Sequence, residues 1–292
     1  MSVRHNRVVT DPQFRADLYQ GAGRDYDQYR LAYPQPLIDD LLRRSGANGN
    51  GRLLDLACGT GQLSFAMCST FAETWAVDQE PDMIAVVEEK ARAAGLTDLR
   101  TEICAAEDLS APEASFDLVV IGNAFHRMRR DDVAARVLRW LRPGGLLALV
   151  WGGSPWEGDA SWQQELAAIM RRWRSRVESG AEAVERVPTG YEQARQARPD
   201  MTILESLGFE LAGSFSFEVT HHWTPDEIVG FAYSTSVLSR RAVGDLGPEF
   251  EEDLRRELDA YVQAGGLRQA IEFAYRLACR PLAGAQPLNT WL

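Results

Sequence analysis

The sequence of 292 residues predicts an α/β fold in which helices cover both faces of a parallel, doubly wound sheet. Short apolar runs alternate with helical segments between residues 53 and 151. The first run leads into a glycine-rich turn, and the second ends at the carboxylate of Asp78. In sheets of this kind, ligands bind at the carboxyl ends of the strands. We therefore expect a binding site at that edge of the sheet.

The glycine-rich turn follows the strand expected at residues 53–56 and leads into a helix that starts at Gln62. A strand, a tight turn and a helix start bring backbone N–H groups close to an anion or a cofactor. Gly59 and Gly61 suit such a turn, because a side chain would block the approach or require a positive φ. Ordinary strand–helix connections share this pattern, so the turn alone does not distinguish the two interpretations.

Asp78 closes the short apolar run at residues 74–77 and lies 17 residues beyond Gly61. This is close to the spacing at which a second strand presents a carboxylate to ribose hydroxyls. The turn and the carboxylate together predict a cofactor that contains a nucleoside.

The rest of the chain completes the sheet and adds two insertions. Further strands are expected at residues 99–104, 116–121, 146–151, 209–219 and 271–279, the last two as antiparallel partners. Helices are expected at residues 11–44 with a break at 21–23, at 131–141, at 161–177 and at 201–207. A capping box at residues 224–227 opens a helix inside the second insertion, and an apolar stripe at residues 250–262 predicts another. Both insertions are expected over the strand ends, as a substrate lid.

Composition excludes several classes of function. The net charge of -11 opposes nucleic acid or an anionic membrane surface as the main partner. No apolar run reaches membrane-spanning length and the first residues do not resemble a signal peptide, so we expect a cytoplasmic protein without membrane association. The four cysteines lack metal-ligand spacing, so neither a metal site nor a disulfide framework is expected.

Five segments, in order and at the right separations, carry a resemblance to a known family. They are residues 55–61, Asp78, residues 106–109, residues 116–120 and residues 141–145. The chain resembles the class I S-adenosylmethionine-dependent methyltransferases over most of residues 20–280, in particular their small-molecule, natural-product members. A nicotinamide dehydrogenase fits poorly, because its fingerprint does not require Asp55 before the glycines.

The resemblance implies a Rossmann-like, seven-stranded sheet of order 3-2-1-4-5-7-6 with the last strand antiparallel. It also implies an N-terminal helical lid at residues 1–46. The cofactor-binding core would comprise residues 47–151, 199–222 and 267–281, and the lid insertions residues 152–198 and 223–266. The implied cofactor is S-adenosyl-L-methionine, with S-adenosyl-L-homocysteine as its product.

The resemblance also assigns the cofactor-binding residues. They would be Tyr26, Arg30, Asp55, Ala57, Gly59, Gly61, Asp78, Gln79, Met83, Ala106, Glu107 and Asn123. Asp55 would engage the methionine amino group, and Arg30 would reach the methionine carboxylate. Ala57 replaces a frequent glycine and is expected in the β region at little cost. Met83 is alternatively a core residue, Glu107 a solvated loop acid and Arg30 a surface cation.

Candidate catalytic and substrate-binding residues are fewer. His126, at the end of the fourth strand, is the first candidate base, although it alternatively binds the cofactor or loop backbone. His221 and His222 are a second pair, of which a strand turns only one toward a pocket. Trp151, Trp156 and Tyr19 are expected to line the substrate pocket, with buried packing as the alternative for the tryptophans.

The acid excess lies mainly in the half of the chain that carries the lid, which predicts steering of a cationic substrate. The preferred hypothesis is N-methylation of an amino sugar or aminoglycoside-like natural product, as in antibiotic biosynthesis. O-methylation of a hydroxylated sugar, polyketide or phenolic metabolite is the alternative. A hypothesis of another class is a non-catalytic module that only binds the cofactor. The sequence leaves the oligomeric state open between a monomer and a homodimer.

Overall fold

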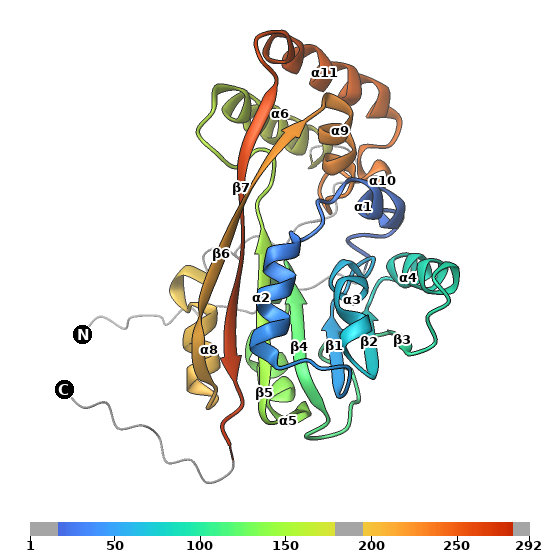
Figure 1. The fold of residues 1–292 in the computed structure, drawn as a ribbon. Helices are drawn as coiled ribbons and strands as arrows, with labels where there is room; N and C mark the ends of the chain where they lie inside the picture. The colour runs from blue at the N-terminus through green and yellow to red at the C-terminus, as the bar shows by residue number, and fades with distance from the viewer. Residues whose placement is uncertain (1–16, 179–194, 283–292) are drawn as a thin grey trace, which may run out of the picture.

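The computed structural model describes residues 17–178 and 195–282, and its centre is a seven-stranded sheet of order β3-β2-β1-β4-β5-β7-β6 (Figure 1). The strands are β1 (Arg52–Leu56), β2 (Glu73–Asp78), β3 (Leu99–Ile103), β4 (Phe116–Gly122), β5 (Leu141–Gly152), β6 (Glu210–Trp223) and β7 (Leu267–Cys279). The first five pair in parallel, and β7 runs antiparallel to both β5 and β6. The predicted fold class and strand order are confirmed.

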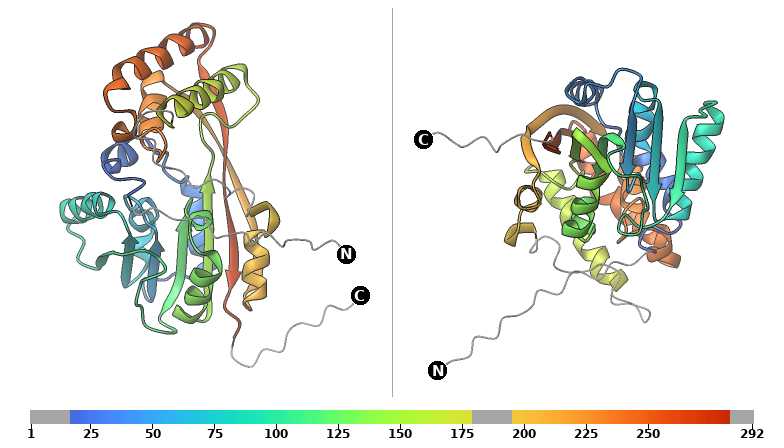
Figure 2. Two further views of the ribbon diagram at one scale, coloured as in Figure 1. Left: turned by 180° about the vertical axis from the view of Figure 1, so that it is seen from behind. Right: turned by 90° about the horizontal axis from the view of Figure 1, so that it is seen from below.

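Helices cover both faces of the sheet, as the alternation of apolar segments requires (Figure 2). The helices on one face are α2 (Gln35–Ser45), α3 (Gln62–Met67) and α4 (Pro81–Ala93), and those on the other are α5 (Arg130–Trp140) and α8 (Asp200–Ser206). Neighbouring strand residues point to opposite faces, so Leu53 packs with the α2 side and Leu54 with the α5 side. The central strands are therefore buried on both sides.

The strands β6 and β7 form a long two-stranded arm that rises beyond the rest of the sheet (Figure 1). Pairing of β5 with β7 stops at Gly152 and Phe273, whereas pairing of β6 with β7 continues to Trp223 and Leu267. The predicted strands at 209–219 and 271–279 were therefore too short. Beyond the end of β5, packing against the lid stabilises the arm. The sequence of the two strands does not reveal this packing, so it does not predict their full length.

The lid consists of the helices that the arm carries. They are α6 (Ser161–Glu178), α9 (Pro225–Tyr233), α10 (Arg240–Val243) and α11 (Gly247–Gln263). Apolar side chains of α6, α9 and α11 join the core cluster that begins under α2. The capping box of Thr224 and Glu227 is present as predicted. Since one cluster runs from sheet to lid, the lid is packed as part of the same core.

The helix α1 (Gly23–Tyr29) connects the lid to the sheet layer. A Cβ on Gly23 would lie 2.8 Å from the carbonyl oxygen of Asp82, and a Cβ on Gly230 of α9 would overlap the ring of Tyr29. Arg240 of α10 donates two hydrogen bonds to Asp25, at 2.9 and 3.1 Å. The start of the helix expected at residues 11–44 falls partly outside the described residues.

Two local expectations were wrong. The segment Arg142-Pro143-Gly144-Gly145, expected as a turn, is a bulge inside β5, where register passes from Phe116↔Leu141 to Leu118↔Leu146. Ala57, expected in the β region, has a φ of 58° in the left-handed region.

In the described ranges, no helix is long and apolar enough to span a membrane, and no cluster of three or more potential metal ligands occurs. The division of the chain into lid and core segments stays a prediction.

Candidate cofactor and substrate site

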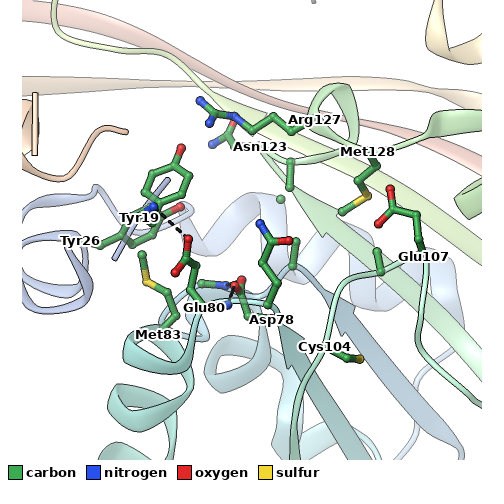
Figure 3. A pocket seen from close by; sticks show the side chains of 16 residues that line it. Tyr19, Tyr26, Asp78, Glu80, Met83, Cys104, Glu107, Asn123, Arg127 and Met128 are labelled. Carbon is green, nitrogen blue, oxygen red and sulfur yellow. Dashed lines mark hydrogen bonds between the residues drawn. The ribbon is translucent and has the colours of Figure 1, made fainter. Parts of the chain in front are cut away.

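Two connected spaces lie at the carboxyl ends of β1, β2, β4 and β5. The first, called here the inner pocket, is bordered by the turns after β1, β2 and β3 (Figure 3). The second, called the chamber, has a volume of about 700 Å³ and is bordered by β5, α6, β7 and the segment after α9. Tyr19, Tyr26, Asn123, Ala124 and Arg127 line both spaces. Two ligands bound in them would therefore meet at these residues.

Asp78 ends β2 and lines the inner pocket with only 8 % of its surface exposed. Its Oδ2 accepts a hydrogen bond from the N–H of Gly59 at 2.8 Å, and its Oδ1 accepts from the N–H of Glu80 at 2.9 Å. These bonds fix the carboxylate between the first two turns. Burial raises its pKa, and the backbone donors oppose that rise. A carboxylate offers about four lone-pair sites, so both oxygens can accept further donors.

The turn after β1 is strained at Ala57, whose left-handed backbone conformation would suit a glycine. Gly59 and Gly61 have φ values of 55° and 79°, as their residue type permits, and Gly61 caps α3. Ala57 has a Cβ and pays a conformational penalty of about 1 kcal/mol in this region. Gly59 also faces Tyr26, whose ring would lie 3.3 Å from a Cβ at that position. Ala57 and Gly59 both line the inner pocket.

Asp55 lies outside the inner pocket and contacts the start of α3. Its Oδ2 accepts from both the N–H and the hydroxyl of Ser64, at 2.9 and 2.6 Å, so it caps the first turn of α3. It is 1 % exposed and is not among the residues that line the inner pocket. Burial raises its pKa to about 7. In this structure Asp55 organises the turn, and its predicted contact with an amino group stays a prediction.

Glu80 was missed from the sequence. It lines the inner pocket, is 3 % exposed and accepts a hydrogen bond from the N–H of Tyr19 at 2.9 Å (Figure 3). Burial raises its pKa to about 7, and Asp78 adds to that rise. Its position two residues after Asp78, directly before the helix-starting Pro81, was the available signal.

Other predicted cofactor residues also border the inner pocket. Gln79, Met83, Ala106 and Glu107 line it. Met83 is 2 % exposed, so it serves both the pocket and the packing of α4. Glu107 accepts a hydrogen bond from the N–H of Arg129 at 2.8 Å, which orients the loop after β3 toward η2 (Phe125–Arg127).

Asn123 stands where the two spaces join. It has a φ of 51°, which asparagine tolerates better than most residues. Its side chain donates to Tyr33 Oη and accepts from the N–H of Gly152, both at 3.4 Å. Arg30 lines the chamber, donates to Ser234 Oγ at 2.8 Å and lies over the rings of Tyr26 and Phe231. No ion pair holds Arg30 to a carboxylate within the described ranges.

The candidate bases have unequal positions. His126 lines the chamber, and its Nε2 faces the Nε of Arg127 at 3.3 Å. Burial lowers its pKa to about 4, and Arg127 adds to that effect, so the ring is neutral at neutral pH. His221 lies in the arm, with its ring 4.5 Å from that of Trp223 and its Nε2 3.7 Å from Glu227. Neither His221 nor the exposed His222 lines the inner pocket or the chamber.

Trp151, Trp156 and Tyr19 line the chamber, in keeping with their predicted place. The loop after β5 is held by two buried amides. Gln163 Nε2 donates to the carbonyls of Pro155 and Glu157, at 3.2 and 2.9 Å, and Gln269 Nε2 donates to those of Ser154 and Glu157, both at 3.0 Å. Trp156 packs edge-on against Phe231 of α9. The chamber wall is therefore fixed by the lid as well as by the sheet.

The charges that line the chamber differ in sign from the acid excess of the lid half of the chain, and steering of a cationic substrate by that excess stays a prediction. The acids of the lid that form described ion pairs do so on its outer surface, as in the pairs Arg176–Glu249 and Arg172–Asp253. The chamber itself is lined by six arginines and two acids. Among the described residues of the predicted lid insertions, Glu157 is the one acid that lines this space.

The doubly wound sheet, its strand order of 3-2-1-4-5-7-6 and its antiparallel last strands match the fold of the class I methyltransferases. Residues 53–145 match a family model described as a methyltransferase domain. The sequence of these core residues is therefore similar to that of methyltransferases.

Two curated relatives each match about half of this chain. An uncharacterised methyltransferase of Mycobacterium bovis is 32 % identical over 147 residues, which are 50 % of this chain and 56 % of that protein. Methyltransferase-like protein 27 of Homo sapiens is 32 % identical over 155 residues, 50 % of this chain and 61 % of that protein. The chain thus spans a little over half the length of these relatives.

Solved structures extend the likeness of fold to most of the chain. A protein of Anaeromyxobacter dehalogenans, assigned provisionally as a type II methyltransferase, has a TM-score of 0.56 and 20 % identity, covering 86 % of this chain and 97 % of that one. The [4+2]-cyclase SpnF has a TM-score of 0.50 and 19 % identity, covering 88 % and 85 %. At these identities the likeness concerns the fold alone.

Proposed function

We propose that this chain transfers the methyl group of S-adenosylmethionine to a small molecule held in the chamber. The observation that supports the proposal is the junction of two unlike spaces at Tyr26, Asn123 and Arg127. The inner pocket has the buried carboxylate and open turns that a nucleoside needs. The chamber has the size of a site for a drug-sized molecule. A group leaving one space at the junction would enter the other.

The residues of the inner pocket fit the cofactor. Asp78 retains capacity to accept both ribose hydroxyls, since each oxygen is occupied by one backbone donor. Met83, Ala106 and Glu107 would border adenine. Tyr26, Arg30 and Asn123 would hold the methionine end, with the guanidinium of Arg30 on its carboxylate. All of these are proposed roles.

Bound S-adenosylmethionine supplies an electrophilic methyl carbon, which an acceptor lone pair takes as the carbon–sulfur bond breaks. The chain aligns the two molecules and excludes water by packing α1 against α9. His126 is neutral at neutral pH, but a pKa of about 4 makes it a weak base. The acceptor atom should therefore need little help in losing its proton.

The nature of the acceptor is a finer proposal. N-methylation of a cationic amino sugar is disfavoured by the six arginines of the chamber, and O-methylation of a hydroxylated metabolite is the better candidate of the two predicted classes. A role in antibiotic biosynthesis and a cytoplasmic location stay predictions. A small molecule remains the proposed partner, because the chamber between sheet and lid has a volume of about 700 Å³.

A second candidate is binding of the cofactor without methyl transfer. The fold likeness to the [4+2]-cyclase SpnF supports keeping it, because that protein is named for another reaction. Calorimetric titration with S-adenosylmethionine tests whether the chain binds the cofactor, and a micromolar Kd is expected. An assay with labelled S-adenosylmethionine and a panel of hydroxylated, carboxylated and amino acceptors tests whether the chain transfers the methyl group. Binding without transfer to any acceptor would favour the binding module, and absence of binding would overturn both candidates.

A further inference from the structure

The arginines of the chamber come from parts of the chain that are far apart in sequence. They are Arg30, Arg127, Arg171, Arg174, Arg195 and Arg276. Two of them have acidic partners among the described residues, because Arg174 pairs with Glu178 at 2.8 Å and Arg195 with Asp200 at 3.4 Å. Arg30 is the residue proposed for the cofactor carboxylate. Three arginines then remain for the second ligand.

These three arginines have no ion pair in the described part of the chain. Arg127 donates only to neutral groups, to His126 Nε2 at 3.3 Å and to Ser236 Oγ at 3.4 Å. The guanidinium of Arg276 lies 5.2 Å from the centre of the Trp151 ring and makes no hydrogen bond to a described residue. Arg171 is exposed at the end of the chamber formed by α6. A half-buried guanidinium without an acceptor is costly, so Arg127 and Arg276 favour an anionic ligand, to which the exposed Arg171 adds a positive charge at the α6 end of the chamber.

The acids that line the chamber do not neutralise the arginines. Asp200 is already shared by Arg130 at 2.8 Å and Arg195 at 3.4 Å. Glu157 is exposed, and its Oε2 accepts from the N–H of Ser154 at 3.0 Å. Burial is the main cause of the lowered pKa of His126; Arg127, Arg195 and Arg130 lower it further, and Asp200 opposes them. Among the described residues that line the chamber, arginines outnumber acids by six to two, in a chain whose net charge is -11.

We propose that the molecule accepted by the chamber carries an anionic group, a carboxylate, sulfonate or phosphate, that binds Arg127, Arg171 and Arg276. Its remaining body is apolar or aromatic, because Leu149, Trp151, Trp156 and Met170 form other parts of the lining. This inference rests on the proposed function, since it names the class of the methyl acceptor. It replaces the cationic acceptor expected from the overall charge.

The test compares two fluorescent probes that share one ring body, 8-anilinonaphthalene-1-sulfonate and neutral N-phenyl-1-naphthylamine. Each is titrated into the full chain with and without saturating S-adenosylhomocysteine. The sulfonate is expected to bind about tenfold more tightly than the neutral probe, which is the effect of one or two charge-assisted hydrogen bonds. Phenylacetate and phenyl phosphate, as competitors, distinguish a carboxylate from a phosphate preference.

Three variants locate the effect. Arg276→Gln and Arg171→Gln are each expected to reduce the preference for the sulfonate about three- to tenfold, whereas Arg276→Lys keeps most of it. Arg92→Gln, on the exposed surface of α4, is the matched control and should change nothing. Since Arg171 is exposed, its replacement remains informative even if the variant at Arg276 does not fold.

Two outcomes would overturn the inference: equal affinities for both probes, or a sulfonate preference that persists in both glutamine variants. The proposed function fails separately. If S-adenosylhomocysteine does not bind but the sulfonate preference depends on Arg276, the chamber binds anions without a methyl donor. If the cofactor binds and the preference is absent, only the anionic acceptor is wrong.

Discussion

The two spaces of the site differ in charge and in how the chain builds them. The inner pocket presents three acids, Asp78, Glu80 and Glu107, on turns between neighbouring elements of the sheet. The chamber presents six arginines from segments that meet only through the lid and the arm. The first is built by local sequence and backbone geometry, and the second by tertiary packing. The net charge of the chain describes neither of them.

The largest predicted effect concerns the acids of the inner pocket. Asp78→Ala should weaken binding of S-adenosylhomocysteine about 10- to 100-fold, because it removes charge-assisted hydrogen bonds and leaves the N–H groups of Gly59 and Glu80 without their acceptor. Calorimetry measures this effect. Asp98→Ala, at an exposed loop position, is the control. An unchanged affinity of the Asp78 variant would remove the ribose assignment.

The contact between α1 and the lid comes next. Gly230→Ala should destabilise the fold by about 1–3 kcal/mol, because the new Cβ overlaps the ring of Tyr29. It should also raise the Kd for the cofactor, since α1 carries Tyr26. Gly247→Ala is the matched control, as its Cβ would lie 3.4 Å from the hydroxyl of Tyr233. Thermal unfolding of the two variants decides the point, and equal melting temperatures would show that α1 does not depend on this close approach.

Stability should depend on pH through Asp55. Its folded pKa of about 7 lies above the ordinary value of 3.8, so burial of the neutral acid contributes stability that is complete below about pH 4. That contribution is lost as pH rises toward and through 7. The melting temperature of the wild type should therefore fall from pH 5 to pH 8 more than that of Asp55→Asn. The raised pKa of Glu80 also makes stability fall as pH rises, equally in both proteins. The lowered pKa of His126 has the opposite effect below pH 6.5, where stability rises with pH. Parallel pH profiles of the two proteins would contradict the assignment.

The smallest predicted effect concerns the turn itself. Ala57→Gly should raise stability by at most about 1 kcal/mol, because it relieves a left-handed φ of 58° at the expense of greater freedom in the unfolded chain. Ala114→Gly, at a φ of 50° away from the site, gives a reference for the same change. A clear loss of stability on Ala57→Gly, with none at residue 114, would mean that the methyl group of Ala57 contributes packing that exceeds the strain.

The same contrast explains what the sequence could predict. The turns after β1 and β2 were predictable, because they depend on residues close together along the chain, such as Asp55, Gly59, Gly61 and Asp78. The strand order was predictable only through the resemblance to a known family. The left-handed conformation of Ala57 was not, since alanine disfavours it and only the surrounding turn imposes it.

The chamber was harder to predict for a physical reason. Arg127, Arg171 and Arg276 resemble ordinary surface arginines in sequence, and only the arm and lid bring them to one space. One signal was present, because Arg276 interrupts the otherwise apolar residues 273–278 of a strand that is internal to the sheet. A single charged residue in such a strand indicates either that the strand lies at the edge of the sheet or that the charge binds a ligand. The strand β7 lies between β5 and β6, so it is not an edge strand.

A crystal structure with S-adenosylhomocysteine tests the central claim most directly, namely that a nucleoside cofactor in the inner pocket faces a second ligand in the chamber. We expect both ribose hydroxyls on Asp78, adenine beside Met83 and Ala106, and the sulfur near Asn123 with an open path into the arginine-lined chamber. A ligand bound elsewhere, or a sulfur atom closed off from the chamber, would contradict the account.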